Sequence, residues 1–262
     1  MAEVIIVKDE DEAGEIYAEA VLRLFKEKSD PVLGLATGSS PLAAYRHLAK
    51  RLQREGINTE NVRGFALDEY AGLDPQHPQS YRSTINRTVV EPLHLNPELV
   101  RVPNGNLDTI QTAGADYDAA IAKAGGVDIQ ILGIGTDGHI GFNEPGSSLA
   151  SGTRIKTLTE QTRIDNARFF DNDVTKVPTH CITQGIGTIL KARHLILLAF
   201  GEGKAQAISE TVEGGISSFC PASALQLHPH ATIIVDEAAG GRLRNKDYYK
   251  WAFKNKPEWQ GI

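Results

Sequence analysis

Apolar residues along the chain alternate between short continuous runs and helical spacing. Residues 4–7, 32–36 and 62–67 form runs of strand length. Between the first two runs, and again over residues 42–52, apolar side chains recur every three or four positions, which predicts amphipathic helices. Another helix is expected from about Ser80. Further strands are expected at residues 99–102, 129–132, 154–158, 195–199 and 232–235. This alternation predicts an α/β fold, a single doubly wound, mostly parallel sheet with helices on both faces.

The length and composition favour one domain over residues 1–262, in which residues 235–262 form a C-terminal helix and tail. The 25 Gly and 12 Pro are scattered and mark no linker. The formal net charge is −6, which argues against nucleic acid as a partner and attracts no anion to the molecule as a whole. Any bound anion must therefore be held by local groups.

Signals for export or membrane insertion are not visible in the sequence. The N-terminal apolar run leads directly into four acidic residues at 9–12, and the longest apolar run, residues 195–200, is far too short to cross a membrane. A cytoplasmic protein without a membrane partner is expected. Cys181 and Cys220 have neither a zinc-ligand spacing nor a disulfide framework around them, which favours buried reduced thiols.

The segment at residues 35–41, Leu-Ala-Thr-Gly-Ser-Ser-Pro, joins a predicted strand to a predicted helix. Backbone N–H groups at a helix start, with hydroxyls beside them, are suited to binding phosphate. A plain helix cap without a ligand is the alternative interpretation. The segment is not a P-loop, because no Lys follows the glycine turn.

Two adjacent carboxylates, Asp68 and Glu69, end another predicted strand. Solvated loop residues would look the same, but ligands of parallel sheets bind at the carboxyl ends of strands. Because consecutive strand residues point to opposite faces, the two side chains should diverge, and one of them is expected to be a reacting base.

The most informative segment is residues 132–146, which contains G-x-G-x-x-G after a predicted strand. A dinucleotide-binding turn must open a helix, whereas glycines and a proline interrupt this segment. It is therefore predicted to be a loop that gathers Asp137, His139 and Glu144. Two carboxylates around an imidazole would raise its pKa and suit it to proton transfer. A structural histidine and a metal site are the alternatives, although no HExxH motif supports a metal.

Two cations follow later predicted elements. Arg168 lies in a polar segment, and Lys204 lies in Gly-Glu-Gly-Lys after a buried strand. Most Arg and Lys side chains are merely solvated. Lys204 is the less ordinary of the two, because a glycine-flanked lysine at that position should point into the same crevice as the loops above.

Together these segments resemble the glucosamine-6-phosphate deaminase family, within a wider group of Rossmann-like folds that includes 6-phosphogluconolactonases and ribose-5-phosphate isomerases. The resemblance runs from the first strand to about residue 237, whereas residues 247–262 match only loosely. The run His-Ile-Gly-Phe-Asn-Glu-Pro at 139–145 separates the deaminases from the lactonases. The other specific segments are residues 67–70, 135–145, 151–159 and 221–228.

The resemblance implies conversion of a phosphosugar substrate, glucosamine 6-phosphate, to fructose 6-phosphate and ammonia without a metal or redox cofactor. It assigns Asp68 as the base that moves a proton between C2 and C1. His139, with Asp137 and Glu144, matches the family's ring-opening group. The matching phosphate-binding positions are Gly38, Ser39, Ser40, Arg168 and Lys204. A lactonase-type hydrolase on the same fold and an inactive sugar-phosphate sensor are the alternatives.

Arg154 and Lys156 alternate with Ile155 along a predicted strand, so their side chains share a face. Hexameric members of the resembling family bind an activator, N-acetylglucosamine 6-phosphate, at a subunit interface. The residues that bind it there match Arg154, Lys156 and Ser147 of this chain. Other members are unregulated monomers. A solvated pair of cations is the simpler interpretation. The resemblance therefore leads us to expect an allosteric homo-oligomer, for which a hexamer is one possible assembly.

Overall fold

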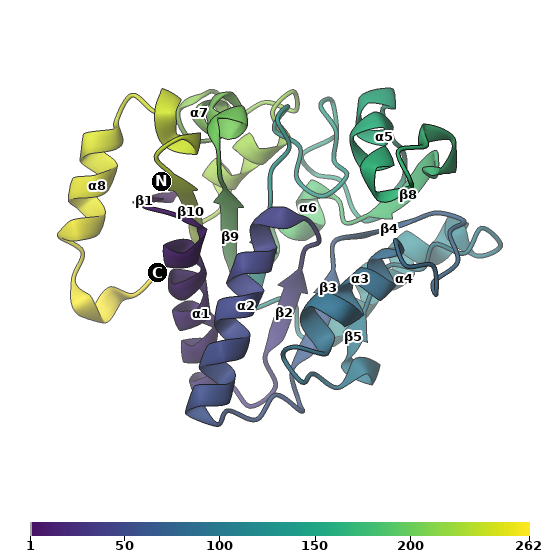
Figure 1. Ribbon diagram of the computed structural model, residues 1–262, viewed down its shortest axis with the longest axis horizontal. Coiled ribbons are helices and arrows are strands. Elements are labelled where there is room, and N and C mark those ends of the chain that lie inside the picture. Colours follow the sequence, from purple (N-terminus) through teal and green to yellow (C-terminus); the bar gives the residue numbers. More distant parts are fainter. Residues whose placement is uncertain (1) are drawn as a thin grey trace.

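A seven-stranded parallel sheet forms the centre of the computed structural model, which describes residues 2–262 (Figure 1). Met1, the first residue of the predicted domain, lies outside the described residues. Every pair of neighbouring strands is parallel, so the predicted fold class is confirmed. From edge to edge the strands are β1 (Glu3–Val7), β10 (Ala231–Asp236), β9 (His194–Ala199), β6 (Ile129–Leu132), β2 (Val32–Leu35), β3 (Arg63–Ala66) and β5 (Val100–Arg101).

Helices cover both faces of this sheet because the crossovers run in two directions. The connections from β1 to β2, β3 and β5 progress toward one edge, whereas those from β6 to β9 and β10 progress toward the other. Right-handed crossovers in opposite directions place their helices on opposite faces. The α-helices are α1 (Glu10–Glu27), α2 (Ser39–Glu55), α3 (Tyr81–Ile85), α4 (Ile110–Lys123), α5 (Glu160–Asn166), α6 (Ile186–Ile189), α7 (Ala205–Glu213) and α8 (Lys246–Lys254).

Several shorter helical segments complete the fold. Helix α3 begins as expected after Ser80, whose hydroxyl caps it, and continues into a π-helical turn at Asn86–Val90. The 3₁₀ helices are Pro97–Leu99, Ala167–Phe169, Val174–Lys176, Glu202–Lys204, Pro221–Leu227, Ala239–Arg242 and Glu258–Gln260. Over residues 2–262, no helix is long and apolar enough to cross a membrane.

The main core lies against the central strands. All residues of β2, β6 and β9 are buried, as expected for strands covered on both faces. Their Val, Leu and Ile side chains pack against the apolar sides of α1 and α2, so that burial of these side chains holds the sheet and its helices together.

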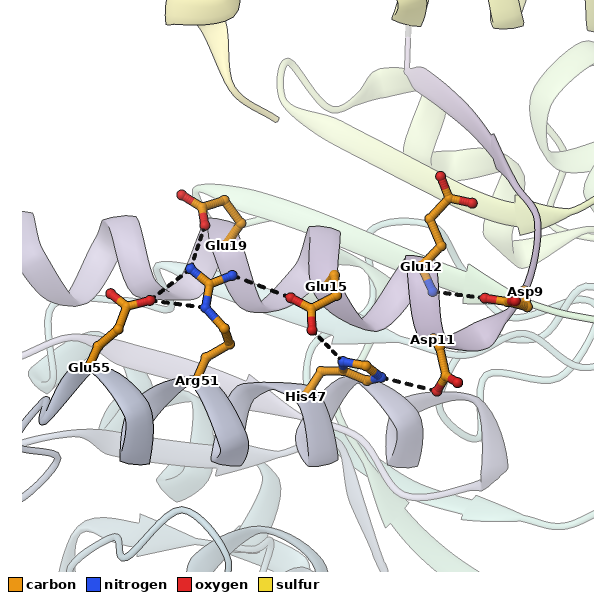
Figure 2. Close-up of polar contacts among 8 residues, drawn as sticks. All are labelled: Asp9, Asp11, Glu12, Glu15, Glu19, His47, Arg51 and Glu55. Carbon is orange, nitrogen blue, oxygen red and sulfur yellow. Dashed lines mark hydrogen bonds and ion pairs between the residues drawn. The ribbon is translucent and has the colours of Figure 1, made fainter.

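An ionic network joins the exposed sides of α1 and α2 (Figure 2). His47 of α2 lies between two carboxylates of α1, with Nδ1 2.7 Å from Glu15 and Nε2 3.0 Å from Asp11. Gly14 lies beneath the ring, where a Cβ atom would approach within 2.6 Å. One helical turn further along α2, Arg51 contacts three carboxylates at 2.8–3.3 Å, those of Glu15, Glu19 and Glu55. The network ties together the two helices that flank β2.

A second sheet, which the sequence pattern did not predict, lies beside the first. It is antiparallel, and its strands are β4 (Asp68–Tyr70), β8 (His180–Thr183) and β7 (Arg154–Thr157), in that order. The strand expected at residues 154–158 is therefore present, but it belongs to this small sheet. A separate apolar cluster packs beneath α5 and consists of Tyr70, Phe142, Leu158, Ala167, Phe170, Val177 and Cys181.

Candidate active site

The predicted site residues converge at the carboxyl edge of the parallel sheet. Between β2 and β6 the strand order changes direction, because the chain proceeds from β2 to β3 on one side and from β6 to β9 on the other. Such a switch point forms a crevice in which ligands of α/β proteins bind. The loops after β9, β6, β2 and β3, four neighbouring strands, carry the candidate groups.

Asp68 begins β4 directly after β3 and is almost completely buried. Thr183 lies opposite it on β8, and Gly141, with φ of 55°, lies so close that a Cβ atom would be 3.3 Å from Oδ2 of Asp68. Burial, and then the charge of Glu69, raise the pKa of Asp68 to about 7, although the charge of His139 acts in the opposite direction. This carboxyl can therefore gain and lose a proton near neutral pH.

Glu69 points away from Asp68, as the alternation of a strand predicts. Its Oε1 accepts hydrogen bonds from the backbone N–H groups of Tyr70 and Tyr81, and its Oε2 accepts one from Arg82. The Glu69 carboxylate thus accepts hydrogen bonds from the start of α3. Of the two acids, Asp68 is therefore the better candidate for a reacting base.

Residues 133–146 form a loop, and no helix begins within them. The prediction that the G-x-G-x-x-G match does not form a dinucleotide-binding turn is therefore confirmed. Gly138 and Gly146 have φ of 85° and 87°, a region that favours glycine. At Gly135 a Cβ atom would lie 2.3 Å from the ring of His139, so the small residue leaves room for the imidazole.

Asp137, His139 and Glu144 come together in this loop. Nδ1 of His139 lies 2.7 Å from Oδ1 of Asp137 and 3.8 Å from Oε2 of Glu144. Burial lowers the pKa of His139, but Asp137 and Glu144 outweigh it and hold that pKa above its ordinary value. Burial also acts on Asp137, yet the histidine brings the pKa of this carboxyl down to about 2. The electrostatic prediction for the loop is confirmed in direction.

These three residues are also where a metal could bind. Within residues 2–262 they are the one group of three His, Cys, Asp or Glu residues whose ligand atoms lie within 4.8 Å of one another. Neither cysteine belongs to this group, and both Cys181 and Cys220 are free and buried. One imidazole with two carboxylates facing its Nδ1 is equally the arrangement of a proton-transfer group.

The start of α2 is open to a ligand. Gly38, with φ of 107°, occupies the N-cap position, and no side chain caps the helix there. Ser39 and Ser40 are its first residues and are not buried. The segment thus presents uncapped N–H groups, two hydroxyls and the positive end of a 17-residue helix toward the switch point.

Lys204 ends a 3₁₀ turn after β9 and donates from Nζ to the backbone oxygen of Ile134, at 2.6 Å. Burial lowers the pKa of Lys204, and the charge of Arg168 acts in the same direction, so the two cations influence one another. Arg168 is exposed in the 3₁₀ helix after α5, where its guanidinium lies 4.7 Å from the ring centre of Phe169. Lys204 therefore lies against the loop that holds His139, and Arg168 is near enough for its charge to act on Lys204.

Of the three residues of the expected effector site, Arg154 lies nearer to the loop of His139 than its sequence position suggested. Arg154 pairs with Thr183 across the small sheet and donates to Oδ1 of Asn143 at 2.8 Å. Lys156 shares its face of β7. Ser147 is buried, and its hydroxyl makes no hydrogen bond within the described part of the chain.

Two groups that contact candidate catalytic carboxylates were not predicted from the sequence. Thr183 lies beside Asp68, and Thr162 donates to Oε1 of Glu144 at 2.6 Å. Thr183 belongs to a four-residue strand with no clear alternation, and Thr162 lies 18 positions from its partner. A Thr-x-x-Thr spacing before a helix was visible, but it indicates only a cap.

The chain is similar to known proteins over most of its length. Residues 10–234 match the family described as glucosamine-6-phosphate isomerases/6-phosphogluconolactonase. A glucosamine-6-phosphate deaminase from Bifidobacterium longum (strain DJO10A) is 70% identical over the full length of both chains. One from Streptomyces coelicolor is 57% identical and covers 99% of this chain and 100% of its own.

Solved structures extend the comparison. A monomeric glucosamine-6-phosphate deaminase is 41% identical with a TM-score of 0.88, over 91% of this chain and 99% of that one. A 6-phosphogluconolactonase from Leishmania guyanensis, at 20% identity and a TM-score of 0.70 over 92% and 98% of the two chains, shares the fold. The chain belongs to the family of glucosamine-6-phosphate isomerases and 6-phosphogluconolactonases.

Proposed function

We propose that the protein isomerises and deaminates glucosamine 6-phosphate, giving fructose 6-phosphate and ammonia. The observation that carries the proposal is the buried Asp68 carboxyl, with its pKa near 7, at the same sheet edge as the His139 loop. A lactonase would need no base that acts on carbon. The high identity to proteins named glucosamine-6-phosphate deaminase supports the same choice.

The first chemical step opens the sugar ring, and His139 is suited to it. A protonated imidazole can deliver its proton to the ring oxygen, and the anomeric hydroxyl gives up a proton as the C1 aldehyde forms. Asp137 and Glu144 favour the charged imidazole, so a proton is available near neutral pH.

Asp68 then moves a proton between carbons. Its carboxylate removes the C2 proton, which the neighbouring aldehyde makes acidic, and the resulting enolamine accepts a proton at C1 to become a ketimine at C2. Water adds to that carbon and ammonia leaves, which gives the ketose. A pKa near 7 lets Asp68 both take and return the proton.

The phosphate group of the substrate would hold the sugar in the site. The N–H groups and hydroxyls of Gly38, Ser39 and Ser40 would bind its oxygens, and Lys204 and Arg168 would supply positive charge. Because the molecule carries a net charge of −6, these local groups must provide the attraction.

A coupled assay for ammonia and fructose 6-phosphate, run with and without a chelator, tests the proposed reaction. We expect both products in equal amounts and no effect of the chelator. Hydrolysis of 6-phosphogluconolactone without ammonia release from the amino sugar would show the lactonase activity in its place, and binding of the sugar without either reaction would show a sensor.

An effector site at Ser147, Arg154 and Lys156 is a second part of the proposal. Neither cation has a carboxylate within 4.0 Å among the residues described, and burial lowers the pKa of Arg154, so an anion would stabilise both. Arg154 contacts Asn143, which precedes catalytic Glu144 in the chain. N-acetylglucosamine 6-phosphate bound there in a homo-oligomer would favour the active arrangement of that loop.

Substrate saturation curves with and without N-acetylglucosamine 6-phosphate test this part, together with a light-scattering mass. We expect a sigmoidal curve that becomes hyperbolic with the effector, and loss of the response in Lys156→Ala. Superimposable wild-type curves would eliminate the effector site. A monomeric mass would eliminate the interface, and would match the monomeric relative.

A further inference from the structure

A threonine hydroxyl at the start of α5 holds one oxygen of the buried Glu144 carboxylate. Oγ1 of Thr162 donates to Oε1 of Glu144 at 2.6 Å, and Oγ1 of Thr159, the N-cap residue of α5, lies 3.3 Å from the same oxygen. The two hydroxyls are 2.9 Å apart. Both Thr162 and Glu144 are more than nine-tenths buried. Oε1 is therefore fixed by short contacts in a site from which water is excluded.

The other oxygen of Glu144 is left for the histidine. Oε2 is buried and has no hydrogen-bond partner among residues 2–262, and it lies 3.8 Å from Nδ1 of His139. A buried carboxylate oxygen without a donor is costly unless a positive charge lies nearby. The contact at Oε1 thus determines the direction in which the free oxygen points, and that direction is toward the imidazole.

The segment that supplies the hydroxyls also carries a phosphate-binding candidate. Helix α5 begins one residue after Thr159 and runs directly into the 3₁₀ helix that contains Arg168. Asn166, at the end of α5, donates to the hydroxyl of Tyr70 at 3.0 Å, so this end of the segment rests on the small sheet. One short helical unit therefore contacts Glu144 at its start and presents Arg168 just beyond its end.

We propose that Thr162 is a positioning residue for the ring-opening step, and that through it the segment carrying Arg168 holds Glu144 beside His139. This role rests on the proposed function, because it concerns the proton that His139 supplies to the sugar. Thr162 itself touches no reacting atom. It acts by keeping a negative charge next to the imidazole, which keeps the imidazole protonated.

Replacement of Thr162 by Val, which has nearly the same shape, removes the hydroxyl. We expect the pKa of His139, measured by NMR titration without substrate, to fall by roughly half a unit. The kcat for glucosamine 6-phosphate should fall about tenfold, as for loss of a hydrogen bond to a charged group, with KM changed less than about twofold. The basic limb of the pH profile should move to lower pH, because protonated His139 is lost earlier. Thr162→Ser keeps the hydroxyl and should restore the wild-type pKa of His139, the wild-type kcat and the wild-type pH profile.

Thr188→Val is the matched control. Thr188 is as buried as Thr162, and its hydroxyl lies 3.1 Å from both oxygens of another carboxylate, that of Asp118. This variant should leave the pKa of His139 unchanged. An unchanged or higher His139 pKa in Thr162→Val, or the same fall in Thr188→Val, would overturn the proposal. The NMR titration needs no turnover, so it tests the role of Thr162 even if wild-type protein releases no ammonia. Absence of ammonia release would overturn only the proposed function.

Discussion

Asp68 shows how surroundings change the chemistry of an ordinary side chain. In water an aspartate is ionised at neutral pH and is too weak a base to remove a proton from carbon. Burial makes the charged form less stable, so Asp68 holds its proton until about pH 7 and becomes a stronger base when it loses it. In the proposed mechanism, the same burial would keep water away from the carbanion-like intermediate.

Replacement of Asp68 by Asn should abolish proton exchange at C2. The variant keeps the shape of the side chain, so phosphosugar binding should change little, whereas kcat should fall by roughly 10²-fold or more, as for loss of a general base. Exchange of the C2 proton with deuterated solvent, followed by NMR, is the measurement. If exchange persisted in this variant and ceased in Glu69→Gln, the base would be Glu69.

Lys204 should act on binding more than on chemistry. In Lys204→Met the preference for glucosamine 6-phosphate over glucosamine should weaken, mainly through a higher KM, because a partly buried positive charge beside the phosphate is lost. Initial rates with both sugars measure it, and Lys191→Met, an exposed lysine before β9, is the control. If Lys204→Met discriminated between the two sugars as well as wild type does, Lys204 would not belong to the phosphate site. Arg168→Ala tests Arg168 by the same comparison.

At the scale of elements, α2 connects stability to binding. Its first turn is the proposed phosphate site, and its middle is tied to α1 by His47 and Arg51 (Figure 2). A helix end binds an anion well only if the helix is already in place, because any movement would consume binding energy. The ionic network is therefore expected to support the proposed phosphate site, although none of its residues belongs to that site.

Arg51→Gln should lower the melting temperature by about 1–3 °C, a modest amount because the carboxylates around it are largely solvated. The difference should shrink in about 1 M salt, which screens exposed charges. Thermal melting in both conditions measures it. Arg54→Gln is the control, since Arg54 is exposed and forms no ion pair within the described chain. Equal effects of the two substitutions would contradict a specific role of the network.

The parallel sheet could be predicted from the sequence, whereas only one strand of the small antiparallel sheet could. All seven strands of the parallel sheet were expected, because continuous apolar runs between amphipathic helices leave little ambiguity. Strands β4 and β8 were missed, because β4 follows β3 after a single residue and β8 shows no clear alternation of polar and apolar residues. Asp68 was expected at the end of one strand, but it opens another, and this places it deep in the protein.

The candidate site was likewise predicted in its local parts. Asp137, His139 and Glu144 are neighbours in sequence, so their meeting in one loop could be read from the spacing. Contacts between distant segments could not be. The hydroxyl of Thr162 reaches Glu144 only because α5 packs over the small apolar cluster, and no pattern of residue types encodes that packing.

Across the whole molecule, a further group with an altered pKa lies at the starts of β9 and β10, away from the candidate site. His194 is buried, its Nε2 lies 2.9 Å from Oγ1 of Thr232, and its ring stacks on His230 with 3.7 Å between ring centres. Burial, with smaller contributions from the charges of His230 and His228, lowers the pKa of His194 to about 3. The folded protein therefore holds this imidazole neutral where the unfolded chain would protonate it.

The free energy of unfolding should consequently decrease as the pH falls. The contribution of His194 is complete above about pH 6.5, the ordinary value, and is lost between there and about pH 3, at up to about 1.4 kcal/mol per pH unit. Denaturant unfolding at several pH values measures the slope. In His194→Gln the slope should be smaller, whereas His180→Gln, at an exposed position, should leave it as in wild type. Equal slopes in all three proteins would contradict this assignment.

The position of β1 has a consequence for how the protein is made. This strand is at the edge of the sheet, and its one partner among the described strands is β10, the last strand to be synthesised (Figure 1). Because synthesis proceeds from the N-terminus, β1 leaves the ribosome more than 200 residues before residues 231–236 can pair with it. A nascent chain therefore displays an apolar strand with unpaired backbone groups throughout its synthesis, which makes it a natural client for chaperones.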